Sequence, residues 1–338
     1  MKNCIQNSIK KVISMSKIFL LLFLFSCSVS QGKSNNFKLK KIGEISYKVF
    51  DQYMSIPNEV YFSDKDIFHF TNIKSQNQII IDLKNNQKYT FGTKGKGPGE
   101  FLFSNAFVEF KNNKYCLDQF SRKIVVYDSL NQFLFGQRNR EYSLLDLEKN
   151  NNYLLGITGL LENSFNLYFF NSELKVMKKQ KIEFPYLKSY SNIERVNLFA
   201  SSKFLCIQNK LFQIFKYQPK IIIYNLETFK SKEINYKQNL PYVPEKPGFH
   251  KNWFGGSFIC RSIGYDKNKI YFKLDNNFMS EKNRKISLYC LNLRTNKFEK
   301  MELDENIDLK ENISIDNGFL YIFNNDDEQI IKYDLIEE

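Results

Sequence analysis

One short pattern recurs six times along the 338-residue chain, and this recurrence constrains the fold more than any other feature. Each copy consists of three or four apolar or aromatic residues followed by Asp or Asn, as in Ile79–Asp82 and Ile221–Asn225. The copies end at Asp82, Asp128, Asn171, Asn225, Asn292 and Asp334, which are 46, 43, 54, 67 and 42 residues apart. A repeat of this length is typical of stacked supersecondary units, each of which buries its apolar face against its neighbours.

Each copy lies within a series of short strand-like segments. In the second repeat, Lys114–Asp118 precedes the copy, a polar stretch at 119–123 separates the two, and Gln132–Phe135 follows. Strands separated by polar turns are typical of antiparallel hairpins, and an Asp or Asn side chain at a strand end can accept hydrogen bonds from the next turn. A leading strand such as Asn105–Phe110 gives about four strands per repeat, which is the composition of a β-propeller blade. Aromatic residues make up 16% of the chain and alanine is nearly absent, which also favours strands.

Six copies predict an all-β fold, a six-bladed β-propeller with four-stranded antiparallel blades, over residues 37–338. The last copy, at Asp334, leaves no room for an outer strand before Glu338. The strand-like segment Phe37–Ile45 has no other assignment, so we expect this N-terminal strand to complete the last blade and close the ring. A pair of β-sandwiches is the alternative, and the even recurrence of the pattern favours the propeller.

The first residues have the composition of an export signal. Three lysines, ending with Lys17, precede the apolar run Ile18–Phe25, which is too short to span a bilayer. The sequence therefore predicts a signal peptide over residues 1–26, and Met15 is an alternative start that would give a more compact signal. The stretch Leu24-Phe25-Ser26-Cys27 resembles a bacterial lipobox.

The resemblance to a lipobox implies that Cys27 is lipidated and becomes the first residue of the mature chain. Residues 27–36 are polar and predict a flexible tether. An ordinary cleaved signal that ends near a cysteine is the alternative. In both cases the protein is predicted to be exported, and with lipidation it is anchored in the cell envelope, at the outer membrane, through Cys27 alone.

A glycine-rich stretch, Phe91–Phe101, joins the first repeat to the second. Its form, F-G-x-x-G-x-G-P-G-x-F, resembles the turn signature of NHL-type propeller repeats. Together with the lipobox and the six repeats, it makes residues 37–338 similar to the six-bladed, NHL- or TolB-like propeller lipoproteins of Bacteroidota. The later joints, such as Gly136–Arg140, lack these glycines, so the resemblance implies a fold and a location more than a reaction. A phosphate cradle is disfavoured because Pro98 and Gly99 lead into a strand and not into a helix.

The longest insertion lies between the fourth and fifth copies. The stretch Pro241–Gly256 holds three of the seven prolines and the single tryptophan, Trp253. Long loops on rigid scaffolds often carry function, so Trp253, His250 and Lys251 are the first candidates for a binding surface. An ordinary packed insertion is the alternative. The other histidine, His69, lies in a strand-like run and is predicted to be structural.

In a propeller, the loops that join the blades share one face with the loops between the second and third strands. A charged rim on this face would suit carboxylates, sulfates or phosphates. Scattered surface arginines are the alternative. The candidates for this rim are Glu100, Arg122, Arg138, Arg140, Arg195 and Arg261.

The cysteines and the net charge limit the kinds of metal site, disulfide and binding partner that the sequence predicts. Cys116, Cys206, Cys260 and Cys290 are isolated within apolar runs, which predicts buried free thiols; a disulfide is the alternative. No metal-ligand spacing and no cofactor motif is present. The net charge of +13 comes from dispersed lysines, which indicates a solvated surface or attraction to an anionic partner.

These observations favour an exported, monomeric binding or scaffold module whose partner is a protein or a glycan. Nucleic acid is disfavoured as a partner because an exported protein does not meet it. The alternative is a glycan-active or lyase-type enzyme with its site at the mouth of the central channel. That function would require convergent Arg, Tyr, His and acidic side chains there.

Overall fold

Strands account for nearly all the secondary structure of this computed structural model. It describes residues 35–47, 60–64, 66–72, 75–141, 143–184, 196, 199–236, 258–266, 268–276, 285–304 and 307–337, all of which belong to the unit Asn35–Glu338. Within these residues, no helix is long and apolar enough to cross a membrane. The expectation of an all-β chain is confirmed.

Four sheets of four antiparallel strands follow one another along the described part of the chain, and a two-stranded sheet lies between the first and second. The first sheet contains β2 (Tyr61–Asp64), β3 (Ile67–Thr71), β4 (Gln78–Asp82) and β5 (Gln87–Phe91); the short pair is β6 (Thr93–Lys94) and β7 (Glu100–Phe101). The second contains β8 (Ser104–Phe110), β9 (Asn113–Asp118), β10 (Lys123–Tyr127) and β11 (Phe133–Arg138). The third contains β12 (Leu144–Lys149), β13 (Leu154–Thr158), β14 (Ser164–Phe170) and β15 (Val176–Glu183), and the fourth β16 (Lys203–Ile207), β17 (Lys210–Ile214), β18 (Lys220–Asn225) and β19 (Ser231–Asn235).

The remaining eight strands form one closed hydrogen-bonded arrangement among the described residues. They are β20 (Phe258–Tyr265), β21 (Lys269–Asn276), β22 (Lys285–Asn292), β23 (Lys297–Leu303), β24 (Asn312–Asp316), β25 (Phe319–Asn324), β26 (Gln329–Glu337) and β1 (Asn35–Ser46). β20 to β23 pair antiparallel in chain order, as do β24 to β26. β1 pairs antiparallel with β26, and short parallel ladders link β1 to β23 and β20 to β24.

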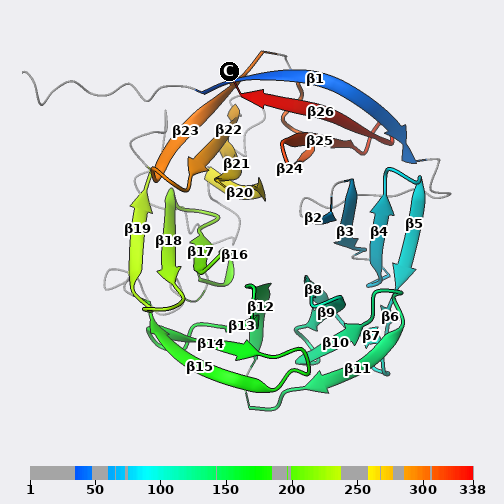
Figure 1. Cartoon of the computed structure of the whole chain (residues 1–338), viewed down its shortest axis with the longest axis vertical. Helices are drawn as coiled ribbons and strands as arrows, with labels where there is room; N and C mark the ends of the chain where they lie inside the picture. Colours follow the sequence, from blue (N-terminus) through cyan, green and yellow to red (C-terminus); the bar gives the residue numbers. More distant parts are fainter. Residues whose placement is uncertain are drawn as a thin grey trace, which may run out of the picture. The chain divides into compact units, whose positions relative to one another are not determined.

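The sheets are arranged in a propeller-like manner, with β2, β8, β12, β16, β20 and β24 nearest the centre (Figure 1). Burial follows this arrangement. All five residues of β4 are buried, whereas five of the six residues of β11, an outer strand of the second sheet, are exposed: Phe133, Leu134 and the run Gly136–Arg138. A middle strand is apolar on both faces because a neighbouring sheet packs on each side of it.

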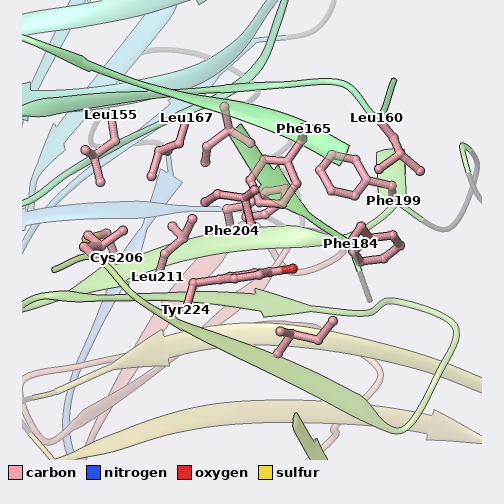
Figure 2. Close-up of a cluster of buried hydrophobic side chains, with 14 of the residues drawn as sticks. Leu155, Leu160, Phe165, Leu167, Phe184, Phe199, Phe204, Cys206, Leu211 and Tyr224 are labelled. Atoms are coloured by element: carbon pink, nitrogen blue, oxygen red, sulfur yellow. The ribbon is translucent and has the colours of Figure 1, made fainter. Parts of the chain in front are cut away.

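Apolar clusters fill the spaces between successive sheets. In the cluster between the third and fourth sheets, Phe165 packs against Phe199 with a ring-centroid distance of 5.0 Å and against Tyr224 at 5.6 Å (Figure 2). Burying one such ring stabilises the fold by about 1.5–3 kcal/mol. The first sheet is packed against β25 in the same way, since the rings of Phe68 and Phe323 lie 5.3 Å apart.

The Asp and Asn residues of the repeat cap the turns that follow their strands, as predicted. Asn225 Oδ1 accepts hydrogen bonds from the backbone N–H groups of Glu227 and Thr228, both at 2.9 Å. Asn292 accepts the equivalent pair at 3.0 and 3.2 Å. The sixth copy differs, because Asp334 lies inside β26 and pairs with Phe319 on one side and Lys40 on the other. The strand continues there because its outer neighbour is β1 and not a following hairpin strand.

The prediction of buried free thiols is also confirmed. Among the described residues, Cys116, Cys206, Cys260 and Cys290 are free and buried. Burial raises the pKa of the Cys260 thiol to about 12, which keeps it in its unreactive protonated form.

Candidate functional site

The residues singled out in the sequence fall into two groups. Trp253, His250, Lys251, Arg195 and Cys27 lie outside the described residues. The others, Glu100, Arg122, Arg138, Arg140 and Arg261, are described.

Glu100 is held within its own glycine-rich loop. Its Oε2 accepts a hydrogen bond from the backbone N–H of Gly97 at 2.6 Å, and a Cβ at Gly95 would lie 2.1 Å from the same oxygen. The glycine at 95 therefore makes room for this carboxylate. Lys123 Nζ clamps the loop by donating to the carbonyls of Gly97 at 3.1 Å and Glu100 at 2.8 Å. Glu100 thus has a clear role in shaping the joint between the first and second sheets.

The second sheet brings two of the arginines together. The backbone N–H of Asn139 donates to the carbonyl of Arg122 at 2.9 Å, and Arg138 is the register partner of Lys123. Arg140 follows directly and is exposed, as are Arg122 and Arg138. Arg261 lies in the middle of β20, opposite Lys273, and so belongs to a different sheet.

A small hollow lies beside Arg122, between the second and third sheets. The space inside it is about 10 Å³, which is no more than a single water molecule needs. Its lining is mostly apolar with a polar margin, and consists of Leu117, Arg122, Ile124, Gln137, Asn139, Leu144, Phe170 and Leu174.

A second group of polar residues lies at the opposite ends of the strands, and the sequence analysis did not select it as a site. Each innermost strand from β8 onward ends in a hairpin or turn to the next strand. The last or penultimate residue of each of these strands belongs to the group. These residues are Glu109 on β8, Glu148 on β12, Cys206 on β16, Tyr265 on β20 and Asp316 on β24. Tyr61 on β2 and His69 on β3 join them, and we call these seven residues the inner-strand cluster.

Electrostatic interactions connect the cluster across the sheets. The pKa of Tyr61 is raised well above its usual value by burial first, and then by Tyr265, Glu148 and Glu109. Burial, followed by Glu148, Asp316 and Cys206, raises the pKa of Tyr265 to about 12. Tyr265 is nevertheless 38% exposed, so the cluster reaches solvent.

Glu148 carries the most unusual carboxyl group of the cluster. Its Oε2 accepts a hydrogen bond from the backbone N–H of Cys206 on the neighbouring sheet at 3.1 Å. Burial and the nearby Asp146 raise the pKa of Glu148 to about 8, against the opposing effects of Lys203, the Cys206 hydrogen bond and Lys149. A large fraction of Glu148 is therefore protonated at neutral pH.

His69 and Glu109 form a pair across the first and second sheets. His69 is 1% exposed, and its Nε2 lies 3.4 Å from Glu109 Oε1. Among the described residues, neither ring nitrogen of His69 has a hydrogen-bond partner of good geometry. The imidazole stacks on Phe107 at 4.3 Å, and Tyr61 approaches both rings edge-on. His69 was predicted to be structural, and its packing on Phe107 agrees with that, but its unsatisfied nitrogens also place it in the cluster.

Burial and the neighbouring charges act in opposite directions on the pKa of each residue of this pair. Burial lowers the pKa of His69 more than Glu109 raises it, so the imidazole is neutral at pH 7. Burial alone would raise the pKa of Glu109, but His69, Lys114 and Lys149 outweigh it and the pKa is lowered. Glu109 is therefore a carboxylate and His69 is an acceptor on one nitrogen and a donor on the other.

Metal binding is not favoured by this arrangement. Within the described ranges, no group of three or more His, Cys, Asp or Glu residues is placed to hold a metal ion. The cluster instead offers carboxylates, phenols and one imidazole from different strands. Such groups can bind a polar or cationic ligand, or can transfer protons.

A sequence signal for the cluster does exist. When the repeats are aligned on their first hairpins, Glu109 and Glu148 occupy the same penultimate position of the leading strand. The candidate rim was instead sought on the loops that join the sheets, which lie at the other end of these strands. Aligning the turns as well as the apolar runs would have found the two glutamates.

The fold and the cluster describe an all-β protein with a propeller-like arrangement of sheets and a cluster of polar residues on its innermost strands. No known protein family matches the sequence, and no curated protein is significantly similar to it. An exported protein of Bacteroides fragilis is similar in structure, with a TM-score of 0.55 at 10% identity over 90% of this chain and 99% of the other. A member of the DUF4221 family from Bacteroides vulgatus also has a TM-score of 0.55, at 12% identity and the same coverage. Virginiamycin B lyase from Staphylococcus aureus has a TM-score of 0.47 at 13% identity, over 89% of this chain and 100% of the other. At these identities the likeness concerns the fold alone.

Proposed function

We propose that the chain forms a six-bladed β-propeller closed by its N-terminal strand. Three observations support this: the six repeats, the apolar clusters between successive sheets, and the pairing of β1 with β26. In this interpretation β20–β23 are the fifth blade, and β24–β26 with β1 are the sixth. The parallel ladders β1–β23 and β20–β24 are then contacts between these two blades.

A crosslink tests the closure. Lys40 and Asp334 are register partners in β1 and β26. We expect the double variant Lys40→Cys, Asp334→Cys to form an intramolecular disulfide on mild oxidation, seen as a mobility shift on a non-reducing gel. The pair Lys38→Cys, Asp334→Cys is two residues out of register and serves as the control. Equal crosslinking of both pairs, or of neither, would refute the closure.

The envelope location is part of the same proposal. The exported state rests on the signal sequence over residues 1–26, and the anchor rests on the lipobox-like stretch that ends at Cys27. Metabolic labelling with a fatty-acid analogue in a bacterial host should mark the wild type and not the Cys27→Ala variant. Equal labelling of the two proteins would refute lipidation at Cys27.

Within the envelope, the protein acts as a binding module for a glycan or a protein, and the inner-strand cluster is its ligand site. The observation that carries this function is the convergence of Tyr61, Glu109, Glu148 and Tyr265 from four different inner strands. Residues on strands are held more rigidly than residues on loops, which suits a preorganised site. The loop at Trp253, His250 and Lys251 and the arginines at 122, 138, 140, 195 and 261 are secondary candidates for contact with a large partner.

The test compares two matched variants. Tyr265→Ala removes an exposed ring of the cluster, and Arg138→Ala removes an exposed charge at the other end of the second sheet. Glycan arrays and envelope fractions are probed with the wild type and with both variants. A ligand that the wild type binds and that Tyr265→Ala fails to bind supports the inner-strand site. If Arg138→Ala loses the ligand and Tyr265→Ala keeps it, the site lies on the rim.

Catalysis is the second candidate, and one observation favours it. Glu148 is a protonated carboxyl near neutral pH, whereas Glu109 is ionised beside a neutral His69. Two groups with pKa values moved apart are the usual requirement for a general acid and a general base. Product analysis of glycans incubated with the wild type and with Glu148→Gln tests it. Turnover that disappears in the variant would make the protein an enzyme of the glycan-active or lyase type.

A further inference from the structure

We infer that the loop edge of the second sheet binds an acidic saccharide chain, with one sugar on the ring of Phe120 and its anionic groups on Arg122 and Arg140. We call this surface the Phe120 edge, and it consists of Phe103, Phe120, Arg122 and Arg140. It lies at the other end of the strands from the inner-strand cluster. The inference therefore goes beyond the proposed function and can fail without it.

The first observation is an exposed pair of stacked aromatic rings. Phe120 is 71% exposed, and its ring stacks on the half-buried Phe103 with a centroid distance of 4.9 Å and an interplanar angle of 30°. Since Phe103 covers one face of this ring, the other face is the one open to solvent. The corresponding turn of the sixth repeat, Asn325–Glu328, contains polar residues only. The fold does not itself require an apolar ring at such a turn.

The two rings are held rigidly, because one buried carboxylate fixes both of the loops that carry them. Asp118 is fully buried, and its Oδ1 accepts hydrogen bonds from the backbone N–H groups of Phe103 at 3.1 Å and Ser121 at 3.2 Å. The backbone N–H of Gln119 also donates to the carbonyl of Phe103 at 3.2 Å. A surface that is rigid before binding loses less conformational entropy when a ligand is bound.

The second observation is a set of arginines beside the rings. Arg122 lies two residues after Phe120 in the same turn, and the backbone N–H of Asn139 donates to the carbonyl of Arg122 at 2.9 Å. This bond places Arg140 next to the turn, and both arginines are exposed. The ion pairs formed among the described residues use lysines and His69, and none of them uses these two guanidinium groups.

The acidic side chains nearby leave the edge positive. Segments 119–122 and 138–141 contain three arginines and one acid, the exposed Glu141. Asp118 lies beneath the turn, and Glu100 is bonded to the backbone of its own glycine-rich loop. The edge is therefore complementary in charge to an anionic ligand.

The shape of the edge favours an elongated ligand. Phe103 precedes β8, Phe120 and Arg122 lie between β9 and β10, and Arg140 follows β11. These four strands are neighbours in one sheet and span on the order of 14 Å from β8 to β11. The hollow beside Arg122 is no larger than a water molecule needs, so we expect the ligand to lie along the surface.

An acidic saccharide uses both chemical features of the edge. The face of a pyranose that carries its C–H groups is apolar and packs on an aromatic ring. A guanidinium group donates two parallel hydrogen bonds to a carboxylate or a sulfate. A neutral saccharide would use the ring alone, and a simple anion would use the arginines alone. The anionic groups have two sources, uronic acids and sulfate esters.

Fluorescence anisotropy of a labelled oligogalacturonate tests the inference, with the protein purified from the bacterial envelope in detergent. The methyl ester of the same oligosaccharide is its neutral counterpart. We expect the free acid to bind at least tenfold more tightly than the ester, and its binding to weaken as the ionic strength rises. This comparison uses the wild type alone, so it does not depend on the folding of any variant.

Matched variants place the ligand on the protein. Phe120→Ala should weaken binding roughly three- to tenfold, because it removes the stacking surface. Arg122→Ala and Arg140→Ala should each weaken it by about tenfold or more, and Arg122→Lys should restore only part, since lysine lacks the planar fork. The controls are Arg294→Ala, an exposed arginine in the turn after β22, and Tyr89→Ala, an exposed ring on β5. Their Kd values should stay within about twofold of the wild type.

Competition separates the two sources of the anionic groups. Dextran sulfate that displaces the probe with the lower Kd indicates sulfate esters, and weaker competition indicates uronic acids. If single-stranded DNA competes as well as the better of these saccharides, the edge attracts any polyanion and the inference is overturned.

The remaining outcomes also decide the matter. Equal binding of the free acid and the ester overturns the inference, as does a failure of both to bind at millimolar concentration. If Tyr265→Ala loses the probe and Phe120→Ala keeps it, the saccharide binds at the inner-strand cluster. That result overturns the present inference and supports the proposed function.

Discussion

Glu100 and Glu148 are both partly buried glutamates, but their surroundings differ. Glu100 lies in a glycine-rich loop whose own backbone satisfies it, and Lys123 secures that loop through two carbonyls. Glu148 accepts a hydrogen bond from the backbone of another sheet and has a second acidic group, Asp146, nearby. The first glutamate is explained completely by the local fold.

This contrast separates polar groups that stabilise the fold from polar groups that point to a function. A polar group that is satisfied by its own loop stabilises that loop. The inner-strand cluster, by contrast, gathers groups from different sheets and leaves His69 unsatisfied among the described residues. Such unpaired groups are the ones that need a reason beyond folding.

The largest expected effect is a loss of stability beside the glycine-rich loop that holds Glu100. Asp118 is fully buried, and its carboxylate accepts from the backbone N–H groups of Leu102 at 2.7 Å, Phe103 at 3.1 Å and Ser121 at 3.2 Å. Asp118→Ala leaves these donors without a partner and should lower the free energy of unfolding by about 3 kcal/mol in urea titrations. Asp118→Asn retains one acceptor and should lose less. A loss below about 1 kcal/mol for the alanine variant would show that the loop does not depend on this carboxylate.

The second effect tests whether Gly95 is needed for Glu100. Gly95→Ala places a Cβ 2.1 Å from Glu100 Oε2, so we expect a loss of about 2 kcal/mol in the same assay. Shortening the opposing side chain should relieve the contact. The double variant Gly95→Ala, Glu100→Ala is therefore predicted to be more stable than the sum of its single changes, and strict additivity would contradict the proposed contact.

The third effect concerns the inner-strand cluster and alkaline pH. The pKa of Glu148 is raised from 4.5 to about 8, so the folded state holds a proton that the unfolded state has lost between these values. Glu148 therefore contributes stability below pH 4.5 that is lost as the pH rises towards 8. Glu148→Gln should flatten this decline by roughly 1 kcal/mol, allowing for solvent screening. Thermal unfolding at pH 5 and pH 8 measures it, and an unchanged pH slope in the variant would refute the assignment.

The smallest effect concerns acid pH. Burial lowers the pKa of His69 below its usual 6.5, so the unfolded state takes up a proton before the folded state does. The stability contributed by neutral His69 is present above pH 6.5 and is lost as the pH falls below it. His69→Phe retains the stacking on Phe107 and removes this dependence. We expect little change at pH 7 and a flatter stability curve between pH 6.5 and 5; a steeper curve would place the acid sensitivity elsewhere.

Local features of the fold were readable from the sequence. The spacing of the repeat, the turn-capping role of residues such as Asn225 and Asn292, and the buried free thiols all depend on a few adjacent residues. Asp334 has no following hairpin turn to cap, because the outer neighbour of its strand is β1, which comes from residues far away in the sequence. Pattern analysis of a short window has no access to such a partner.

The inner-strand cluster could not be found in this way. Tyr61 and Tyr265 are 204 residues apart, and the raised pKa of Tyr61 reports their proximity. Polar residues such as Glu109 and Glu148 also resemble ordinary solvated positions when each repeat is considered alone. Only the arrangement of the sheets brings them together, because every innermost strand contributes one end to the same region.

The pairing of β1 with β26 has a consequence for how the protein is made. Synthesis produces β1 before β26, so the part of β1 beyond Phe37 has no strand partner while more than 280 residues are translated. An unpaired strand is a template for aggregation, and lysines on it reduce that risk. Lys38, Lys40 and Lys41 supply this charge within β1. The strand that pairs with β26 is thus also the strand that must stay soluble longest before its partner is made.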